Sequence, residues 1–249
     1  MEIVPGEIVA LAAIAFAGAL VFGITGFGAA LITIPLSTFI VPLPFALAMF
    51  SLLDLSNALR VGFEDPKSAL RREWLRMAPL ILAGTVTGIT LLVNLPRKAA
   101  MLALAAFVIA MAVSSFVRGG ALRTVAGGWA YAAGFFGGIT STLFGAGGPP
   151  YAIYLSRRGL TKEQYRATLG RCTMLSISMR VIAFLASGLL LDARVWVTAL
   201  FVLPASWLGI TVATRLFRAM SRDRLMRIVA LGLLATGISL AIRASLLVP

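Results

Sequence analysis

The sequence "GGITSTLFGAGGPP" (Gly137–Pro150) decides how this chain folds. It gathers glycines, small hydroxyl residues and two prolines in a stretch that carries no charge from Thr124 to Leu155. Glycine weakens a helix and proline interrupts its hydrogen-bond ladder, so the stretch predicts a break in a helix. In an apolar environment, the backbone N–H and C=O groups that a break releases must be satisfied by protein, water or a ligand.

The rest of the sequence indicates that this environment is a lipid bilayer. Of the 249 residues, 60% are hydrophobic and 12% are charged, whereas about a quarter of the residues of a soluble protein are charged. The only formal charges in 8–63 are Asp54 and Arg60, and 99–117 carries none. Apolar segments of about 20 residues match the thickness of a bilayer. The composition therefore predicts an all-α polytopic membrane protein.

Apolar blocks separated by charged loops predict ten segments. One of them, 148–156, would rise roughly 14 Å as a helix, which is about half of the hydrocarbon core. We therefore expect a re-entrant or broken half-helix at this position. The expected segments are 6–22, 28–41, 44–61, 74–93, 97–117, 124–142, 148–156, 162–189, 194–213 and 222–244.

The chain also repeats itself at low similarity. Four stretches of the first half align in order with stretches of the second half, at offsets between 119 and 125 residues. We therefore expect two transmembrane repeats, 1–119 and 120–249, within one integral membrane domain. The aligned pairs are "GFGAA" (26–30) with "GAGGP" (145–149), "MFSLLDLSNALR" (49–60) with "LGRCTMLSISMR" (169–180), "PLILAGTVTG" (79–88) with "PASWLGITVA" (204–213), and "PRKAAM" (96–101) with "SRDRLM" (221–226).

The loop charges indicate that the second repeat is inverted. Fifteen Lys and Arg residues lie in the alternate loops 67–76, 118–123, 157–166 and 215–227, and the loops of the opposite side contain four. The positive-inside rule places the basic loops in the cytoplasm and both termini outside. Equivalent loops of the two repeats differ in charge, as inverted repeats should. This distribution explains the net charge of +13 without nucleic-acid binding.

The two glycine-rich breaks, 23–35 and 137–150, form the first candidate site. A half-helix that starts after a break directs its free N–H groups and positive dipole end at the break, and glycine lets an anion approach the backbone closely. Two such breaks related by inverted symmetry could hold one anion near the midplane. The alternative is close helix packing, the only role that fits Gly84 and Gly88. The candidate anion-binding glycines are Gly26, Gly28, Gly145, Gly147 and Gly148.

Polar side chains accompany the breaks. The hydroxyls of Thr25, Thr140 and Ser141 can donate to an oxyanion or cap a half-helix. Arg180 lies within an apolar segment, where a charge is a functional candidate, and its guanidinium can donate two parallel hydrogen bonds to an oxyanion. Arg171 lies nine residues earlier, on the opposite helix face, and is expected to be a cytoplasmic anchor.

A second set of polar residues lies three positions apart on one helix: Asp54, Asn57 and Arg60. Asp54 has two possible roles. It forms a structural ion pair with Arg180 or Arg60, or it takes up a proton or a sodium ion that is coupled to transport.

The inventory of reactive side chains argues against catalysis. The chain has no His and a single Cys, Cys172. The commonest general base and metal ligand is therefore missing, and an intrachain disulfide is excluded. Little remains from which to build a nucleophile–base pair or a metal cluster. We expect neither an enzyme nor a cofactor.

Four stretches together resemble the TauE/SafE family of membrane permeases: "GFGAALITIP", "WLRMAPLILAGTVTGITL", "FGAGGPPYAIYL" and "WVTALFVLPASWLGITVATRLF". The resemblance covers nearly the whole chain. It implies movement of small sulfur-containing or organic anions, such as sulfite, thiosulfate, sulfoacetate or sulfonates, across a bacterial inner membrane. Ser51 matches a small-residue run of the family, whereas Arg171 departs from it in the second half. We expect a secondary transporter that works by alternating access, with a passive anion channel as the alternative.

Overall fold

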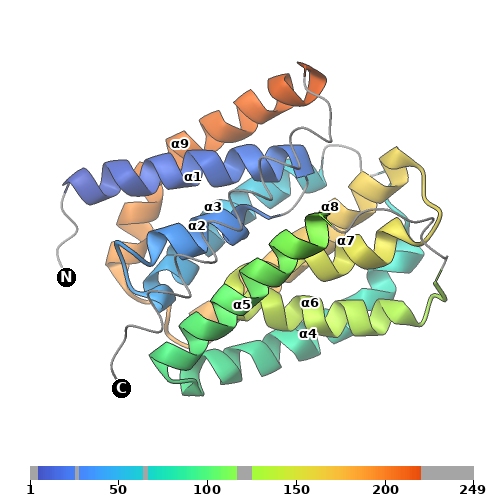
Figure 1. Cartoon of the computed structure of the whole chain (residues 1–249), viewed down its shortest axis with the longest axis horizontal. Helices are drawn as coiled ribbons and strands as arrows, with labels where there is room; N and C mark the ends of the chain where they lie inside the picture. Colours follow the sequence, from blue (N-terminus) through green and yellow to red (C-terminus); the bar gives the residue numbers. More distant parts are fainter. Residues whose placement is uncertain (1–4, 26–27, 64–66, 117–124, 220–249) are drawn as a thin grey trace.

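The computed structural model describes residues 5–25, 28–63, 67–116 and 125–219. Nine helices and no strand occur within these residues (Figure 1), so the predicted all-α class is confirmed. The tenth expected segment, 222–244, and the seam between the expected repeats lie outside them. The helices are α1 (Pro5–Thr25), α2 (Ala29–Ser37), α3 (Leu43–Gly62), α4 (Arg71–Asn94), α5 (Arg97–Phe116), α6 (Trp129–Phe144), α7 (Gly148–Ser156), α8 (Lys162–Ala186) and α9 (Ala193–Ala219).

Two of these helices, α2 and α7, are only nine residues long. Each follows a break at which a glycine adopts the left-handed backbone region that other residues rarely enter. The φ angle is 91° at Gly28 and 72° at Gly145. The predicted half-helix at 148–156 is therefore confirmed.

The boundaries of six helices differ from the prediction by three residues or more. α1 ends at Thr25 instead of 22, α4 begins at Arg71 instead of 74, and α9 ends at Ala219 instead of 213. α2 ends at Ser37 instead of 41, because the hydroxyls of Ser37 and Thr38 donate to the carbonyls of Ile34 and Pro35, at 2.9 and 2.6 Å. α6 begins at Trp129 instead of 124, after a turn that contains two glycines. α8 ends at Ala186 instead of 189, shortly before Gly188, whose φ of 84° stops the helix.

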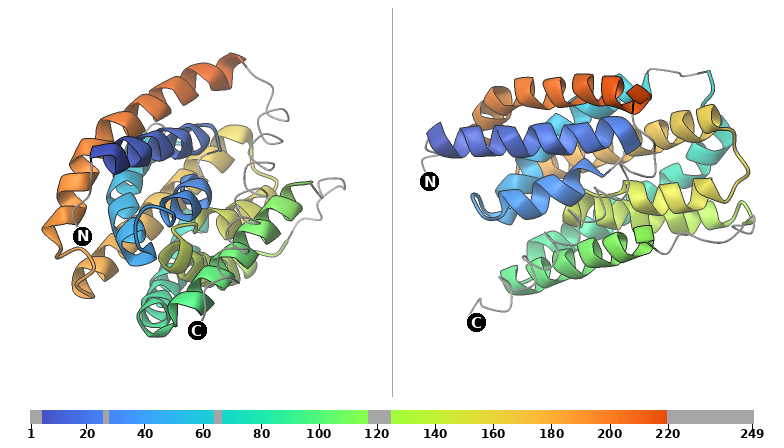
Figure 2. Two further views of the ribbon diagram at one scale, coloured as in Figure 1. Left: turned by 60° about the vertical axis from the view of Figure 1, so that its left-hand side comes forward. Right: turned by 45° about the horizontal axis from the view of Figure 1, so that its top comes forward.

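The long helices pair across the two expected repeats. α1 packs along α9 on one side of the molecule, and α4 packs along α6 on the opposite side (Figures 1 and 2). Between these pairs, α3 contacts α8, and the half-helices α2 and α7 pack against α3 and α8 respectively. The two breaks therefore lie in the interior of the bundle.

Glycines allow the paired helices to approach closely. A Cβ atom on Gly84 of α4 would overlap the carbonyl oxygen of Phe135 of α6, and one on Gly138 of α6 would overlap that of Ile81. A Cβ atom on Gly88 would lie 2.8 Å from the Cβ of Thr142. The prediction that Gly84 and Gly88 serve helix packing is confirmed.

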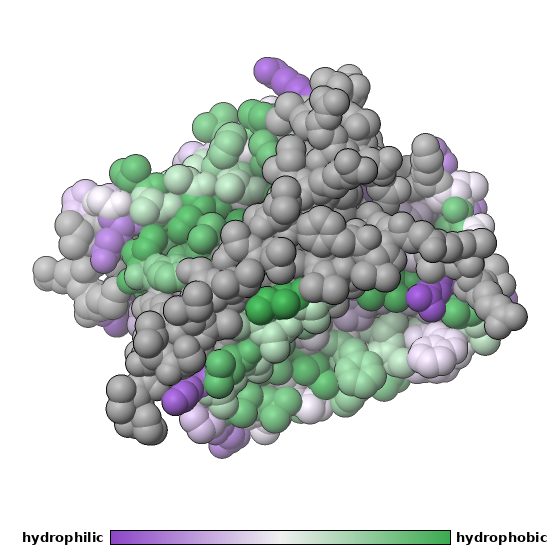
Figure 3. Space-filling model, viewed as in Figure 1, coloured by the Kyte–Doolittle hydropathy of each residue, from purple (hydrophilic) through white to green (hydrophobic). Residues whose placement is uncertain are grey.

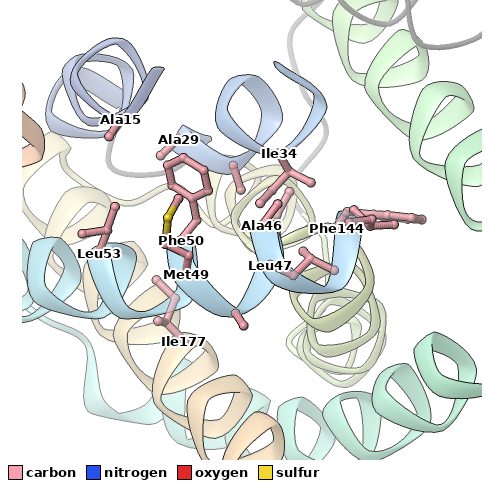
Figure 4. Close-up of a cluster of buried hydrophobic side chains, with 14 of the residues drawn as sticks. Ala15, Ala29, Ile34, Ala46, Leu47, Met49, Phe50, Leu53, Phe144 and Ile177 are labelled. Atoms are coloured by element: carbon pink, nitrogen blue, oxygen red, sulfur yellow. The ribbon is translucent and has the colours of Figure 1, made fainter. Parts of the chain in front are cut away.

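The apolar side chains divide between an interior core and the outer surface. The core gathers Phe50, Met49 and Leu53 of α3 with side chains of α1, α2 and α8 (Figure 4). On the outside, large apolar side chains remain exposed, among them Val86 of α4 at 57% and Leu200 of α9 at 68%. Figure 3 shows hydrophobic residues along the lower edge, where α4 and α6 run. Such a surface suits contact with lipid tails.

Four of the described helices are long and apolar enough to cross a membrane: α1, α4, α8 and α9. The half-helices at the breaks are too short to do so, which agrees with their position inside the bundle.

Candidate anion site

A small cavity lies where the two breaks meet. Its volume is about 10 Å³, which is roughly the room that one water molecule needs. The space at the meeting point of the two breaks is therefore very small. The residues that line it are Phe22, Gly28, Ala29, Ala30, Asp54, Ser141, Gly145, Ala146, Gly147, Gly148, Tyr151, Thr173, Ser176 and Ile177.

Both half-helices begin at this cavity. α2 starts directly after Gly28 and α7 directly after Gly147, and no side chain caps either N-terminus. Uncapped N–H groups and the positive dipole ends of two helices favour a negative charge between them. The second break offers fewer donors, because Pro149 and Pro150 lack an N–H group.

The glycines bring the two breaks into direct contact. A Cβ atom on Gly145 would lie 2.7 Å from the Cβ of Ala30 and 3.1 Å from Nη1 of Arg180. A Cβ atom on Gly147 would lie 2.8 Å from the Gly137 carbonyl oxygen. No larger residue fits at either position without displacing the opposite wall of the site.

A buried ion pair closes one side of the cavity. Nη2 of Arg180 donates to Oδ2 of Asp54 at 2.9 Å, and Nη1 donates to the Ser141 carbonyl at 3.0 Å. Arg180 is 1% exposed and Asp54 is 4% exposed. Asp54 lines the cavity, whereas Arg180 lies behind Asp54 and Ser141. Arg180 is therefore the partner of Asp54, and Arg60 lies exposed near the end of α3.

Buried polar groups in the wall and directly behind it lack a hydrogen-bond partner. The hydroxyls of Ser141 and Thr173, which line the cavity, and Nε of Arg180, which lies behind it, are buried and unpaired. The Tyr151 hydroxyl donates to Oγ of Ser176 at 3.0 Å. Guanidinium and hydroxyl groups can all donate, so the wall is equipped for a ligand that accepts hydrogen bonds from several directions.

Comparison with known proteins decides the family. The family model described as "Sulfite exporter TauE/SafE" matches residues 10–240. The chain belongs to the TauE/SafE family. The resemblance found in the sequence is thus confirmed, and this family is one of membrane transporters.

The TauE/SafE chain is similar to a curated protein of Comamonas testosteroni named "Probable inner membrane transporter protein TsaS". The two are 23% identical over 190 residues, which cover 76% of this chain and 80% of that protein. No solved structure matches the chain.

The structure of this TauE/SafE protein brings some of the predicted residues to the cavity and leaves others away from it. Gly28, Asp54, Ser141, Gly145, Gly147 and Gly148 line it. The Thr140 hydroxyl instead donates to the Phe136 carbonyl of its own helix at 2.9 Å. Gly26 and the side chain of Thr25 lie outside the described residues.

Two further predicted residues stabilise helix contacts at a distance from the cavity. Nδ2 of Asn57 donates to Oγ of Ser206 at 2.8 Å, which joins α3 to α9. The guanidinium of Arg171 lies over the ring of Phe63, 4.8 Å from its centroid. Arg171 does not line the cavity, and its position beside Phe63 is compatible with the expected anchor.

Three polar residues of the cavity escaped the sequence prediction: Tyr151, Thr173 and Ser176. Ser176 gave a signal, because it aligns with Ser56 of the first repeat. Tyr151 follows the prolines of the second break directly. Thr173 gave none, since a single Thr in an apolar helix is usually a packing residue.

A second buried polar cluster joins α4 to the last turn of α7 and to the residues that follow it. Glu73 is 5% exposed. Its carboxylate accepts hydrogen bonds from the Tyr154 hydroxyl at 2.5 Å and from Nη2 of Arg158 at 2.9 Å. Arg158 also donates to the Val125 carbonyl, before α6, at 2.8 Å. The sequence did not predict this cluster, because Glu73 lies among basic loop residues and reads as a solvated charge.

Within the described ranges, no group of three or more His, Cys, Asp and Glu residues gathers. At the surface, hydrogen bonds from Arg194 hold the pKa of Asp192 below its usual value.

Proposed function

We propose that this chain is a secondary transporter that carries a small anion across the bacterial inner membrane by alternating access. The anion would be a sulfur oxyanion, a sulfonate or a related organic anion. The observation that carries the proposal is the meeting of two uncapped half-helix N-termini at one buried cavity backed by Arg180. The family description as a sulfite exporter and the name of the similar protein support the substrate class and the membrane.

The helix contacts support two inverted repeats, in which α1 to α4 correspond to α6 to α9. α4 packs along α6, and their counterparts α9 and α1 also pack together. α4 contacts α8 just as α9 contacts α3, and α3 contacts its own counterpart α8. A two-fold relation between the repeats would produce all of these pairs. The breaks then face each other across the axis, as the anion site requires.

The same contacts suggest which parts move. The tightest helix pairs, α4 with α6 and α1 with α9, each combine one helix from each repeat. We infer that each pair moves as one rigid body, so that the rocking units are mixed pairs of helices instead of whole repeats. We infer that the small volume of the cavity, about 10 Å³, belongs to a stage between the two open states.

The proposal is tested by anion binding and exchange with the purified protein. Thermal unfolding is followed in the presence of sulfite, sulfate, thiosulfate, methanesulfonate and acetate, because a ligand of the folded state raises apparent stability. Proteoliposomes loaded with the same anions then report counterflow. Saturable flux with counterflow is expected of a carrier, whereas flux that neither saturates nor shows counterflow would favour the passive channel.

The role of Arg180 is tested with two substitutions and a control. Arg180→Ala should abolish the ligand-induced stabilisation, and Arg180→Lys should weaken it, because Lys keeps the charge but loses the planar fork. Arg171→Ala removes an Arg from the same helix that does not line the cavity, and it should bind as the wild type does. Unchanged affinity in folded Arg180→Ala protein would remove Arg180 from the site.

A further inference from the structure

An anion in the cavity would compete with Asp54 for the single positive charge of Arg180. Arg180 is the basic side chain that contacts Asp54, and Asp54 is the acidic side chain that lines the cavity, among the described residues. An anion that binds the unpaired Nε of Arg180 shares the single positive charge with the carboxylate of Asp54, which lies 2.9 Å from Nη2. Two buried negative charges then face one cation, and a buried carboxylate whose charge is not compensated is strongly destabilised.

We propose that Asp54 takes up one proton when the anion engages Arg180, so that anion and proton are carried together. This inference rests on the proposed function, since it concerns the ligand of the same site. Protonation removes the negative charge of Asp54, and the new O–H group can donate to the anion. The occupied cavity then contains one cationic side chain, one anion and the two helix N-termini.

The surroundings of Asp54 favour a proton over a metal cation. A sodium ion bound to the carboxylate would lie close to the guanidinium of Arg180, which repels it. A proton instead neutralises the carboxylate and releases Arg180 for the anion.

No other titratable side chain contacts Asp54 among the described residues of the helices around α3. α8 contributes Arg180 beside Asp54, Arg171 over Phe63, and Cys172 in a separate buried cluster. α7 contributes Tyr151, whose hydroxyl is bonded to Ser176. α1, α2 and α9 provide no titratable residue to the cavity. The uptake of one proton is therefore assigned to Asp54.

The experiment uses the purified full chain in proteoliposomes with thiosulfate and methanesulfonate, two anions that stay ionised between pH 5.5 and 8. The membrane potential is held at zero, and a pH gradient is imposed. One proton per anion predicts about tenfold accumulation for each unit of pH difference, because a pH unit corresponds to about 1.4 kcal/mol. A dye sensitive to pH inside the vesicles should report proton entry with the anion.

Asp54→Asn should lose accumulation driven by the pH gradient, and any remaining counterflow should no longer depend on pH. Asp192→Asn is the matched control, because Asp192 also pairs with an Arg but lies at the exposed start of α9. Its lowered pKa keeps it ionised over the tested range, so this variant should accumulate anion as the wild type does.

The outcomes separate this inference from the proposed function. Saturable counterflow in the wild type without any response to the pH gradient, or with a response to a sodium gradient instead, would overturn proton coupling alone. Persistent proton-driven accumulation in Asp54→Asn would overturn the assignment to Asp54. If Asp54→Asn fails to fold, proton entry with the anion in the wild type decides the coupling. Absence of saturable flux for every anion tested would overturn the proposed function itself.

Discussion

Gly145 combines two constraints at one residue. Its φ of 72° lies in the left-handed region, and a Cβ atom there would approach both Ala30 of the other break and Arg180. The missing side chain therefore lets both breaks and the guanidinium meet. Any larger residue would separate them.

Gly145→Ala should lower both stability and anion binding. The left-handed conformation costs a non-glycine residue about 1–2 kcal/mol, and the added methyl group would push Ala30 away. Thermal unfolding with and without anion measures both effects. Gly159→Ala is the control, because Gly159 also has a positive φ, 65°, but no atom lies within 4 Å of its added Cβ. Equal loss of anion binding in both variants would show that the contact with Ala30 is unimportant.

Individual charges of the site were predictable, but their partners were not. Arg180 and Asp54 stand out because each is a charge within an apolar segment. Helical spacing placed Asp54 and Arg60 on one slanting face and so left Arg60 as a partner for Asp54. The contact between α3 and α8 shows that Arg180 is the partner of Asp54. The spacing of residues within one helix does not say which other helix it will contact.

At the scale of elements, the contact between α4 and α6 rests on backbone touching backbone. Gly84 of α4 faces the Phe135 carbonyl, and Gly134 of α6 faces the Met77 carbonyl, 2.7 Å from where its Cβ atom would lie. Helices in a membrane gain most of their attraction from such close packing, because lipid tails are as apolar as the side chains.

Gly84→Ala should therefore destabilise the protein by about 1–3 kcal/mol, as overpacking does. Unfolding in detergent measures the loss. Gly128→Ala, at the start of α6, adds the same methyl group where no atom lies within 4 Å, and it should leave stability nearly unchanged. A loss as large in Gly128→Ala would show that the effect does not come from the packing of α4 against α6.

The two half-helices show what a sequence can say about elements. α7 was predicted because glycines precede it, prolines lie in its first turn and basic residues follow it, so both ends are marked. The end of α2 was missed because it depends on hydrogen bonds from Ser37 and Thr38 back to their own helix. Ser and Thr make such bonds in helices and at helix ends alike, so their presence does not mark a boundary.

At the scale of the whole molecule, the two ends of the helix bundle differ in the side chains that close them. α4 begins beside the end of α7, where Glu73 is bonded to Tyr154 and Arg158. At the offset of the alignment of 79–88 with 204–213, Thr198 of α9 is the counterpart of Glu73, and its hydroxyl donates to the Arg194 carbonyl of its own helix. An ionic cluster therefore lies at one end, and an uncharged side chain lies at the equivalent position of the other end.

Glu73→Gln should favour the proposed transport state in which the end of the molecule that holds the Glu73 cluster is open. A neutral amide holds Arg158 about 1 kcal/mol less strongly than a carboxylate, so the open population should rise about fivefold. Cys172 is the reporter, because it is fully buried in the cluster that contains Tyr154. Its alkylation by a maleimide should accelerate by the same factor.

The surface variant Asp192→Asn serves as the control for this measurement, because it removes an exposed ion pair away from the Glu73 cluster. Alkylation of Cys172 should stay at the wild-type rate in that variant. An unchanged rate in Glu73→Gln would contradict a role of the ionic cluster in closing the molecule.

Because α1 packs against α9, α1 has to wait during synthesis until α9 has been made. About 170 residues separate the end of α1 from the start of α9, and at 5–20 residues per second α1 is complete roughly 10–30 s before its partner exists. During that interval the face that carries Gly23, which later contacts Ala213, has no helix to receive it. Nascent α1 must therefore be held by lipid or by the insertion machinery, and its packing cannot be completed until α9 is made.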